Sequence, residues 1–406
     1  MELLDIDAAA DARVPSRGNW DLIQRNDPAL THLGVYLAEN PPQFGPIVED
    51  AEIGQLGRDT GKNTHLQELE LDWSNDHGMH KDEAMQRLKA FYMGLGQNTS
   101  INTLYLNGKG RGKDDFWEDM CPLLNPFLEK NHNLTKIVTN FKVNREGMRL
   151  LAIPLLRRNN PLDELAFDGN GIDDDAVQDL VVPLLENNPR LAPKHLDLGH
   201  NIGQHGCELI GRLLHDPRCK MEVLELDDSK NIDDNAATTL AKALGENSSL
   251  ERLSLARTSI TTKGFSTICQ SLCNTTSINA TYTSNHTLNS LGWFSRTNNK
   301  LPPQLQQFLE WNRNDNKKLV ARRKVFTQHF IRDFRMEPFE GMQPELLVKS
   351  LHFMDKASEE NNEASHETAR CSILFQLIKS DPMICKIDKS VSVVVDNSRA
   401  AKRRHL

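Results

Sequence analysis

Short segments in which apolar and polar residues alternate recur along the chain. The clearest spans residues 195–203, where Leu196 and Leu198 alternate with polar neighbours before a turn that contains Asn201. The same frame returns at residues 165–172, 224–226 and 253–255. Because successive side chains of a strand point to opposite faces, each segment predicts a short strand with one apolar face.

Apolar residues at helical spacing follow these strands. One unit continues with Leu209, Ile210, Leu213 and Leu214, and the next with Ala237, Leu240, Ala241 and Leu244. This spacing predicts a helix after each strand. A single strand and helix cannot bury their apolar faces alone, so the units must stack to form a core.

The units repeat with a period of 28 to 36 residues. The middle apolar residue of each predicted strand marks the unit: Leu33, Leu69, Leu104, Ile137, Leu165, Leu196, Leu224, Leu253 and Thr281. We interpret Thr281, with Thr283, as a degenerate last strand, as is common in terminal units of a repeat array.

This frame, L-x-x-L-x-L-x-x-N-x-L, resembles that of leucine-rich repeat proteins, and the long units resemble the ribonuclease-inhibitor-like subclass. The resemblance implies an α/β solenoid shaped as a horseshoe, with parallel strands on its concave face and helices on its convex face. Asn170 and Asn201 stand where the chain turns away from the strand. A buried amide there would satisfy backbone groups that are costly to bury unpaired.

The pattern divides the chain into four regions. Residues 1–26 form a flexible lead, 27–295 a solenoid of about nine units, 296–385 a helical cap with a mobile linker at 356–368, and 386–406 a basic tail. The cap is predicted from helical apolar spacing after residue 300, and it would shield the open end of the stack.

The seven cysteines do not form a disulfide framework, since their number is odd and their spacing irregular. No stretch approaches the ~20 apolar residues that a membrane span requires, and no secretory segment is evident at the start. We therefore expect a protein of the cytoplasm or the nucleus that does not enter a membrane.

Charge is unevenly distributed. Residues 301–406 carry 18 Lys and Arg against 14 Asp and Glu, a net +4, so residues 1–300 carry a net −12. The outward strand positions are mostly acidic: Glu68, Glu70, Asp72, Glu164, Asp168, Asp197, Glu225 and Asp227. Lys136 and Arg252 are the basic exceptions. Such a surface attracts a protein with a basic surface and repels nucleic-acid phosphates, although an acidic face kept for solubility has the same pattern.

Aromatic residues on the outward positions are candidate anchors for a partner, because a few large side chains usually dominate an interface. They are Tyr36, Tyr105 and Tyr282, with Trp73 one residue beyond its strand. Trp73 and Tyr105 fall on adjacent strands and would form one patch with the carboxylates. Alternatively, Trp73 packs under its own loop, residues 74–83.

The sequence shows no convincing catalytic, metal or cofactor site. Residues 108–114, GKGRGKD, resemble a phosphate loop, but the glycine spacing is short and Asp114 replaces the Ser or Thr that binds magnesium. His77 and His80 fit a solvated loop better than a metal site. No sequence frame around a Ser suggests an activated nucleophile.

A basic stretch lies in the predicted cap: Lys317, Lys318, Arg322, Arg323, Lys324, Arg332 and Arg335. It fits either a surface for an acidic partner or the polar face of a capping helix, and we favour the capping helix.

These observations favour a non-enzymatic scaffold that binds a partner on an acidic concave face. The alternative is a GTPase regulator, since residues 30–290 resemble the repeats of Ran GTPase-activating proteins. That resemblance would bring Asn107, Arg111 and Asn140 near the GTPase. A fragment of a nucleotide-binding receptor is a third class, disfavoured because the sequence shows no nucleotide domain.

Overall fold

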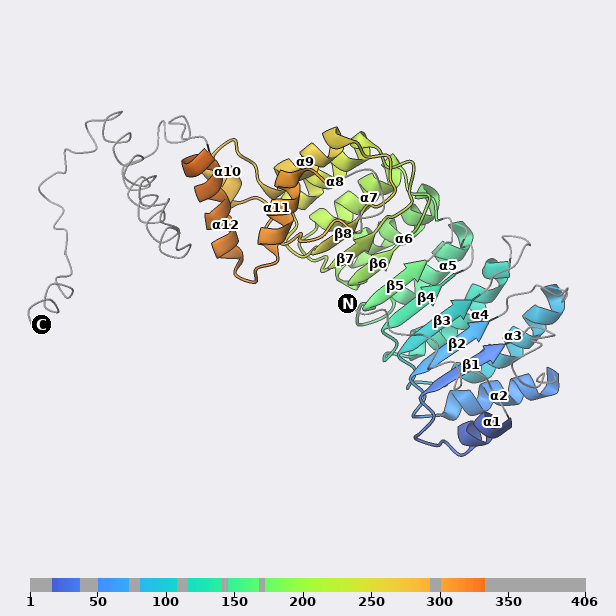
Figure 1. Ribbon diagram of the computed structural model, residues 1–406. Helices are drawn as coiled ribbons and strands as arrows, with labels where there is room; N and C mark the ends of the chain where they lie inside the picture. Colours follow the sequence, from blue (N-terminus) through green and yellow to red (C-terminus); the bar gives the residue numbers. More distant parts are fainter. Residues whose placement is uncertain are drawn as a thin grey trace, which may run out of the picture. The chain divides into compact units, whose positions relative to one another are not determined.

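Eight parallel strands form one sheet, and a helix follows each strand (Figure 1). The computed structural model describes residues 17–36, 50–72, 81–107, 116–140, 143, 145–167, 172–292 and 301–332. The strands are β1 His32–Tyr36, β2 Glu68–Asp72, β3 Thr103–Asn107, β4 Lys136–Thr139, β5 Glu164–Phe167, β6 His195–Asp197, β7 Val223–Glu225 and β8 Arg252–Ser254. They pair in sequence order from β1 to β8.

Helices alternate with the strands. They are α1 Arg17–Gln24, α2 Asp50–Lys62, α3 Lys81–Leu95, α4 Phe116–Lys130, α5 Arg145–Leu156, α6 Asp174–Asn187, α7 Gln204–His215, α8 Asp234–Glu246, α9 Thr262–Leu272, α10 Ile278–Tyr282, α11 Pro303–Asn312 and α12 Lys317–Phe326. A 3-10 turn, η3 Pro189–Leu191, precedes β6, and a π-helix, η4 Thr327–Arg332, follows α12.

The predicted strand markers from Leu33 to Leu253 share one register. Each pairs with the marker of the next strand, from Leu33 with Leu69 to Leu224 with Leu253. All eight are at most 3% exposed. The prediction that Leu196, Leu198, Leu224 and Leu226 are buried is confirmed, since each is 0% exposed.

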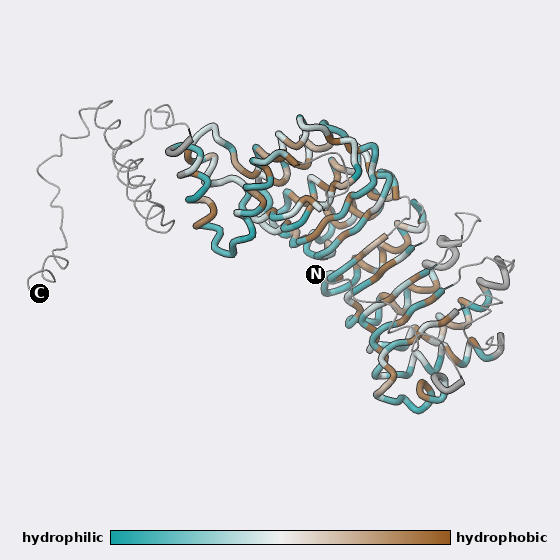
Figure 2. The backbone as a smooth tube through the Cα atoms, in the orientation of Figure 1, coloured by the Kyte–Doolittle hydropathy of each residue, from teal (hydrophilic) through white to brown (hydrophobic). Residues whose placement is uncertain are grey.

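The core is a thin layer between the sheet and the helices. Hydrophobic stretches recur along the strands and on the helices beside them, and the turns are mainly hydrophilic (Figure 2). Consecutive helices from α2 to α9 pack against one another, as do consecutive strands. The predicted α/β class, with parallel strands on one face and helices on the other, is confirmed.

The predicted ninth strand at Thr281 is wrong. Thr281 lies in α10, whose N-terminus is capped by the Ser277 hydroxyl, which accepts a hydrogen bond from the Ala280 amide. The strand position that follows β8 is instead Ser290, which forms an isolated parallel bridge with Arg252. The β-branched residues Thr281 and Thr283 favour a strand, but the Ser277 cap favours a helix at this position.

The predicted buried amide at Asn201 is also wrong, because Asn201 is exposed. Buried asparagines stand instead at or shortly after the ends of several helices: Asn63, Asn98, Asn131, Asn247, Asn285 and Asn312. Asn98 Nδ2 donates to the main-chain oxygens of Thr60 at 2.8 Å and Asn63 at 2.9 Å, in the preceding repeat. This ladder satisfies carbonyls that stacking would otherwise bury unpaired.

Contacts divide the chain into two compact units. The first runs through Cys273 and resumes from Ser284 to Lys317, so α11 belongs to it and packs against α9. The second comprises Asn274–Thr283 and the segment that starts at Lys318. Inside it, the Thr281 hydroxyl lies 2.8 Å from His329 Nε2. The predicted lead before residue 17 and the cap beyond residue 332 lie outside the described residues.

Candidate functional site

The face of the sheet that points away from the helices, here called the sheet face, carries three rows of side chains. Each row consists of residues that lie opposite one another on successive paired strands. The amino-end row is His32, Glu68, Thr103, Lys136, Glu164, His195, Val223 and Arg252. The central row is Gly34, Glu70, Tyr105, Val138, Ala166, Asp197, Glu225 and Ser254. The carboxyl-end row includes Asp72, Asn107 and Asp227.

Ion pairs tie neighbouring strands along the amino-end row. His32 Nε2 lies 2.9 Å from Glu68, and Lys136 Nζ lies 2.8 Å from Glu164. Paired opposite charges on adjacent strands stabilise a sheet modestly. Each of these two carboxylates therefore has a partner on the adjacent strand, the His32 imidazole for Glu68 and the Lys136 ammonium for Glu164.

Glu225 joins the amino-end and central rows. Its carboxylate lies 2.7 Å from the Arg252 guanidinium and 3.5 Å from His195 Nε2. The Glu225 carboxylate raises the pKa of His195 against the opposing effect of burial. In return, His195 and Arg252 lower the pKa of Glu225. His195 therefore carries more positive charge near neutral pH than a free histidine would.

The middle of the central row is uncharged. Tyr105 and Val138 are half-buried, and Ala166 is 6% exposed. The Lys136 ammonium stands 5.7 Å from the centre of the Tyr105 ring. Burial opposes the charge of Lys136, but Glu164 raises its pKa overall. We call Tyr105, Val138 and Ala166 the apolar strip.

Carboxylates flank the apolar strip in the same row. Glu70 precedes it on β2, and Asp197 follows it on β6. Glu70 accepts a hydrogen bond from Asn107 Nδ2 at 2.6 Å, and Asp197 accepts one from the Gly199 amide at 3.0 Å. No Lys or Arg belongs to the central row.

The carboxyl-end row is partly structural. The Asp227 carboxylate accepts hydrogen bonds of 2.7 Å from the Ser254 hydroxyl and from the Ala256 amide. These bonds hold the turn after β8, so Asp227 contributes charge but is tied to the fold. Trp73 and Asp168, predicted for this edge, lie outside the described residues, and so does the side chain of Tyr36.

The structure thus brings most of the predicted acidic residues onto one face: Glu68, Glu70, Asp72, Glu164, Asp197, Glu225 and Asp227. Tyr105 lies among them. Their role in binding stays a prediction. Sequence reasoning missed Val138 and Ala166, although the alternation of β4 and β5 already places them outward. It also missed the imidazoles of His32 and His195, which lie beside Glu68 and Glu225.

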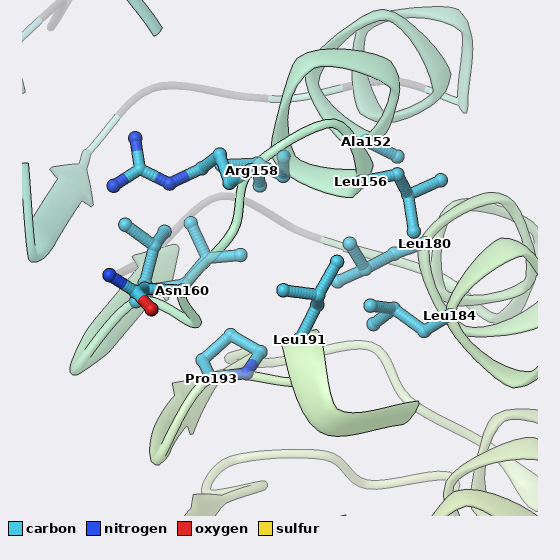
Figure 3. Close-up of a pocket in the computed structure, with 11 residues that line it drawn as sticks. Ala152, Leu156, Arg158, Asn160, Leu180, Leu184, Leu191 and Pro193 are labelled. Atoms are coloured by element: carbon cyan, nitrogen blue, oxygen red, sulfur yellow. The ribbon is translucent and has the colours of Figure 1, made fainter. Parts of the chain in front are cut away.

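A buried cation lies behind the sheet. Arg158 is 5% exposed, and its guanidinium donates to the main-chain oxygens of Leu128, Asn131 and Leu134. Its Nε makes no hydrogen bond to any described residue. Arg158 lines a cavity of about 10 Å³ with Leu180, Leu184 and other apolar residues (Figure 3). That volume holds about one water molecule, so this is a packing feature and not a ligand site.

An open groove of about 590 Å³ runs along the turns that enter β1 to β4. Its lining is almost entirely uncharged: Pro28, Thr31, Thr64, His65, Gln67, Thr99, Ser100, Asn102 and Asn133. Several of these groups already bond within the chain, as Asn133 Nδ2 does to the Thr99 oxygen at 2.7 Å. The groove lacks the convergent titratable groups of an active site.

In the part of the chain that the structure describes, no three His, Cys, Asp or Glu side chains are grouped as metal ligands. The histidines 77 and 80 and the glycine-rich residues 108–114 lie outside that part. None of the described helices combines the length and the apolar character needed to cross a bilayer. The sheet face remains the candidate site.

Comparisons with known proteins point to the same repeat. No protein-family model matches the chain. It is similar to mouse NACHT, LRR and PYD domains-containing protein 14, at 29% identity over 179 residues, which cover 44% of this chain and 17% of that protein. Mouse NACHT, LRR and PYD domains-containing protein 5 is 31% identical over 154 residues, which cover 37% of this chain and 13% of that protein.

These relatives carry LRRs by name, and the structure shows a parallel strand and a helix in every unit. The fold is a leucine-rich repeat solenoid. The chain matches less than a fifth of the length of either relative. A solved yeast complex of Rad7 and Elc1 is similar at 13% identity, with a TM-score of 0.38, over 65% of this chain and 63% of that one.

Proposed function

We propose that this leucine-rich repeat solenoid is a non-enzymatic scaffold, of the ribonuclease-inhibitor-like subclass, that binds a protein with a basic surface on its sheet face. The observation that carries the proposal is the central row, which has an apolar middle, carboxylates at both flanks and no Lys or Arg. An apolar centre within a polar rim is the usual anatomy of a protein interface. The similarity to LRR-carrying proteins supports a binding role.

The charge of the face argues for a basic protein and against nucleic acid. Lys136 pairs with Glu164 of the amino-end row and Arg252 pairs with Glu225 of the central row, and the central and carboxyl-end rows add the carboxylates of Glu70, Asp72, Asp197 and Asp227, which give the face a negative potential. That potential speeds the approach of a cationic surface and repels phosphates. Substituting Glu68 and Glu70 with Gln should chiefly slow association and reduce its salt dependence.

Affinity purification with matched variants tests the proposal. The sheet-face variant Glu70→Lys/Asp197→Lys reverses two central-row charges. The control variant Glu208→Lys/Glu246→Lys makes the same change on helices α7 and α8, where both side chains are exposed. A partner retained by the wild type and the control, but lost by the sheet-face variant, supports the proposal. A partner that binds all three proteins equally contradicts it.

Trp73 remains a proposed anchor beside Tyr105. Trp73→Ala should then cost about 2 kcal/mol or more of binding free energy to the identified partner. A GTPase-regulating role, the alternative function, is tested by measuring hydrolysis by small GTPases with and without the protein. Acceleration would favour that alternative over a scaffold.

A further inference from the structure

The apolar strip has dimensions that restrict what can bind it. It is three strands wide, so it extends about 10 Å across the sheet, because neighbouring strands lie about 4.8 Å apart. Along the strands it is one row deep, about 7 Å, since residues on one face repeat every two positions. A helix is about 10–12 Å in diameter with its side chains, so this strip accepts a narrower segment.

Charge defines the ends of this site. Glu70 lies two strands before Val138, and Asp197 lies two strands after it. Each flanking carboxylate is therefore about 10 Å from the middle of the strip. In an extended segment, which advances about 3.4 Å per residue, that distance corresponds to about three residues.

Lys136 determines which side chains of a partner can lie on the middle of the apolar strip. Glu164 holds its ammonium at 2.8 Å, and the same ammonium stands 5.7 Å from the centre of the Tyr105 ring. A second cation on this ring would meet a like charge. The residue that a partner places on the apolar strip is therefore uncharged, and its cations belong at the flanks.

We propose that the sheet face binds an extended segment in which one apolar residue lies on the apolar strip and basic residues stand about three positions to either side. The segment crosses β2 to β6, with its cations beside Glu70 and Asp197. This inference rests on the proposed function, because it assumes that the sheet face is the binding surface. It does not require unpaired carboxylates, since each one offers about four acceptor sites.

Two labelled peptides of identical composition test the spacing by fluorescence polarisation with the full chain. One is Arg-Ser-Ser-Leu-Ser-Ser-Arg, and the other is Ser-Ser-Arg-Leu-Arg-Ser-Ser. The spaced peptide should bind about tenfold more tightly, because only it can reach both carboxylates while its leucine covers the strip. Equal affinities would overturn the proposed spacing.

Variants of the chain then separate this inference from the proposed function. Glu70→Gln and Asp197→Asn should each weaken binding of the spaced peptide about two- to fivefold, as expected for ion pairs at a protein surface. Tyr105→Ala should weaken it about tenfold or more, and the control Glu208→Gln on α7 should have no effect. Circular dichroism confirms that each variant is folded. Val138→Thr keeps the shape of the side chain but makes it polar, so the peptide affinity of this variant is a second test of contact with the apolar strip.

Three results would show whether only this inference fails or the proposed function fails with it. If both peptides bind equally and both respond to Glu70→Gln, the face attracts basic segments without the proposed spacing, so only this inference fails. If the spaced peptide binds more tightly but ignores Tyr105→Ala and Val138→Thr, the apolar strip is not its contact and this inference also fails. If no variant of the sheet face changes the binding of either peptide, the proposed function fails as well.

Discussion

The buried guanidinium of Arg158 donates a hydrogen bond of 3.0 Å from Nη1 to the main-chain oxygen of Asn131, one repeat earlier. It also bonds to the main-chain oxygens of Leu128 and Leu134. In a preceding repeat, the side-chain amide of Asn98 bonds to the main-chain oxygens of Thr60 and Asn63. These two bonds correspond to those that Arg158 makes to Leu128 and Asn131. A cation therefore replaces an asparagine of the ladder, and burial lowers its pKa.

Removing this side chain should destabilise the protein. Arg158→Met leaves three buried carbonyls without a donor, so we expect a loss of about 2–4 kcal/mol in the free energy of unfolding by urea. Arg157→Met is the matched control, because Arg157 is exposed and pairs with Glu129 at the surface. Its effect should stay within about 0.5 kcal/mol. Equal losses for both variants would contradict a special role for Arg158.

Leu198 tests the repeat register. It is fully buried between adjacent units, so Leu198→Ala should cost about 2–5 kcal/mol. Amide hydrogen exchange should show weakened protection in the neighbouring units as well, because stability in a solenoid passes through nearest-neighbour interfaces. Met93→Ala serves as the control, since Met93 is 74% exposed. Unchanged stability in Leu198→Ala would refute this register.

Replacing each of two helical glycines with alanine should change the stability of the protein in opposite directions. In α2, a Cβ added at Gly57 would lie 2.3 Å from the main-chain oxygen of Phe91 in α3. In α8, a Cβ at Gly245 would meet nothing within 4 Å. Gly57→Ala should therefore destabilise by about 1–3 kcal/mol, because it forces two helices apart. Gly245→Ala should stabilise by about 0.5–1 kcal/mol through helix propensity. Thermal unfolding measures both, and the same sign for the two variants would exclude this explanation.

The pKa of His195 makes part of the stability depend on pH. The charged groups around it are Glu164 on β5, Asp197 on its own strand and Glu225 on β7, which also pairs with Arg252. Its folded pKa is raised above 6.5, so its stabilising contribution is full below that value and is lost as pH rises through the folded pKa. The pKa of Glu225 is lowered from 4.5, so its contribution is lost only as pH falls through the lowered value.

His195→Gln should therefore reduce the free energy of unfolding more at about pH 6 than at about pH 9. His205→Gln removes an exposed imidazole from α7 and controls for general effects. Urea unfolding at both pH values gives the comparison. A loss that is the same at both values, or greater at pH 9, would exclude the pair with Glu225 as its cause.

The sequence could have located the ninth unit. A buried asparagine stands six residues before the strand markers Leu69, Leu104, Ile137 and Leu253. Asn285 has the same distance to Leu291, whose neighbour Ser290 forms the bridge to Arg252. The strand pattern alone favoured Thr281, because alternation over a few residues does not distinguish a weak strand from a short capped helix.

The sequence by itself determined the repeat: the strand at each leucine marker, the helix after it and the outward position of the acidic residues. These follow from side-chain periodicity, which is local. Only the tertiary structure decided which charges are balanced. The pairs Lys136–Glu164 and Arg252–Glu225 join residues 28 and 27 positions apart, and sequence spacing does not predict such contacts before the strands are aligned. The same alignment joined Tyr105, Val138 and Ala166 from three strands into one strip, because packing, and not local pattern, sets which residues become neighbours.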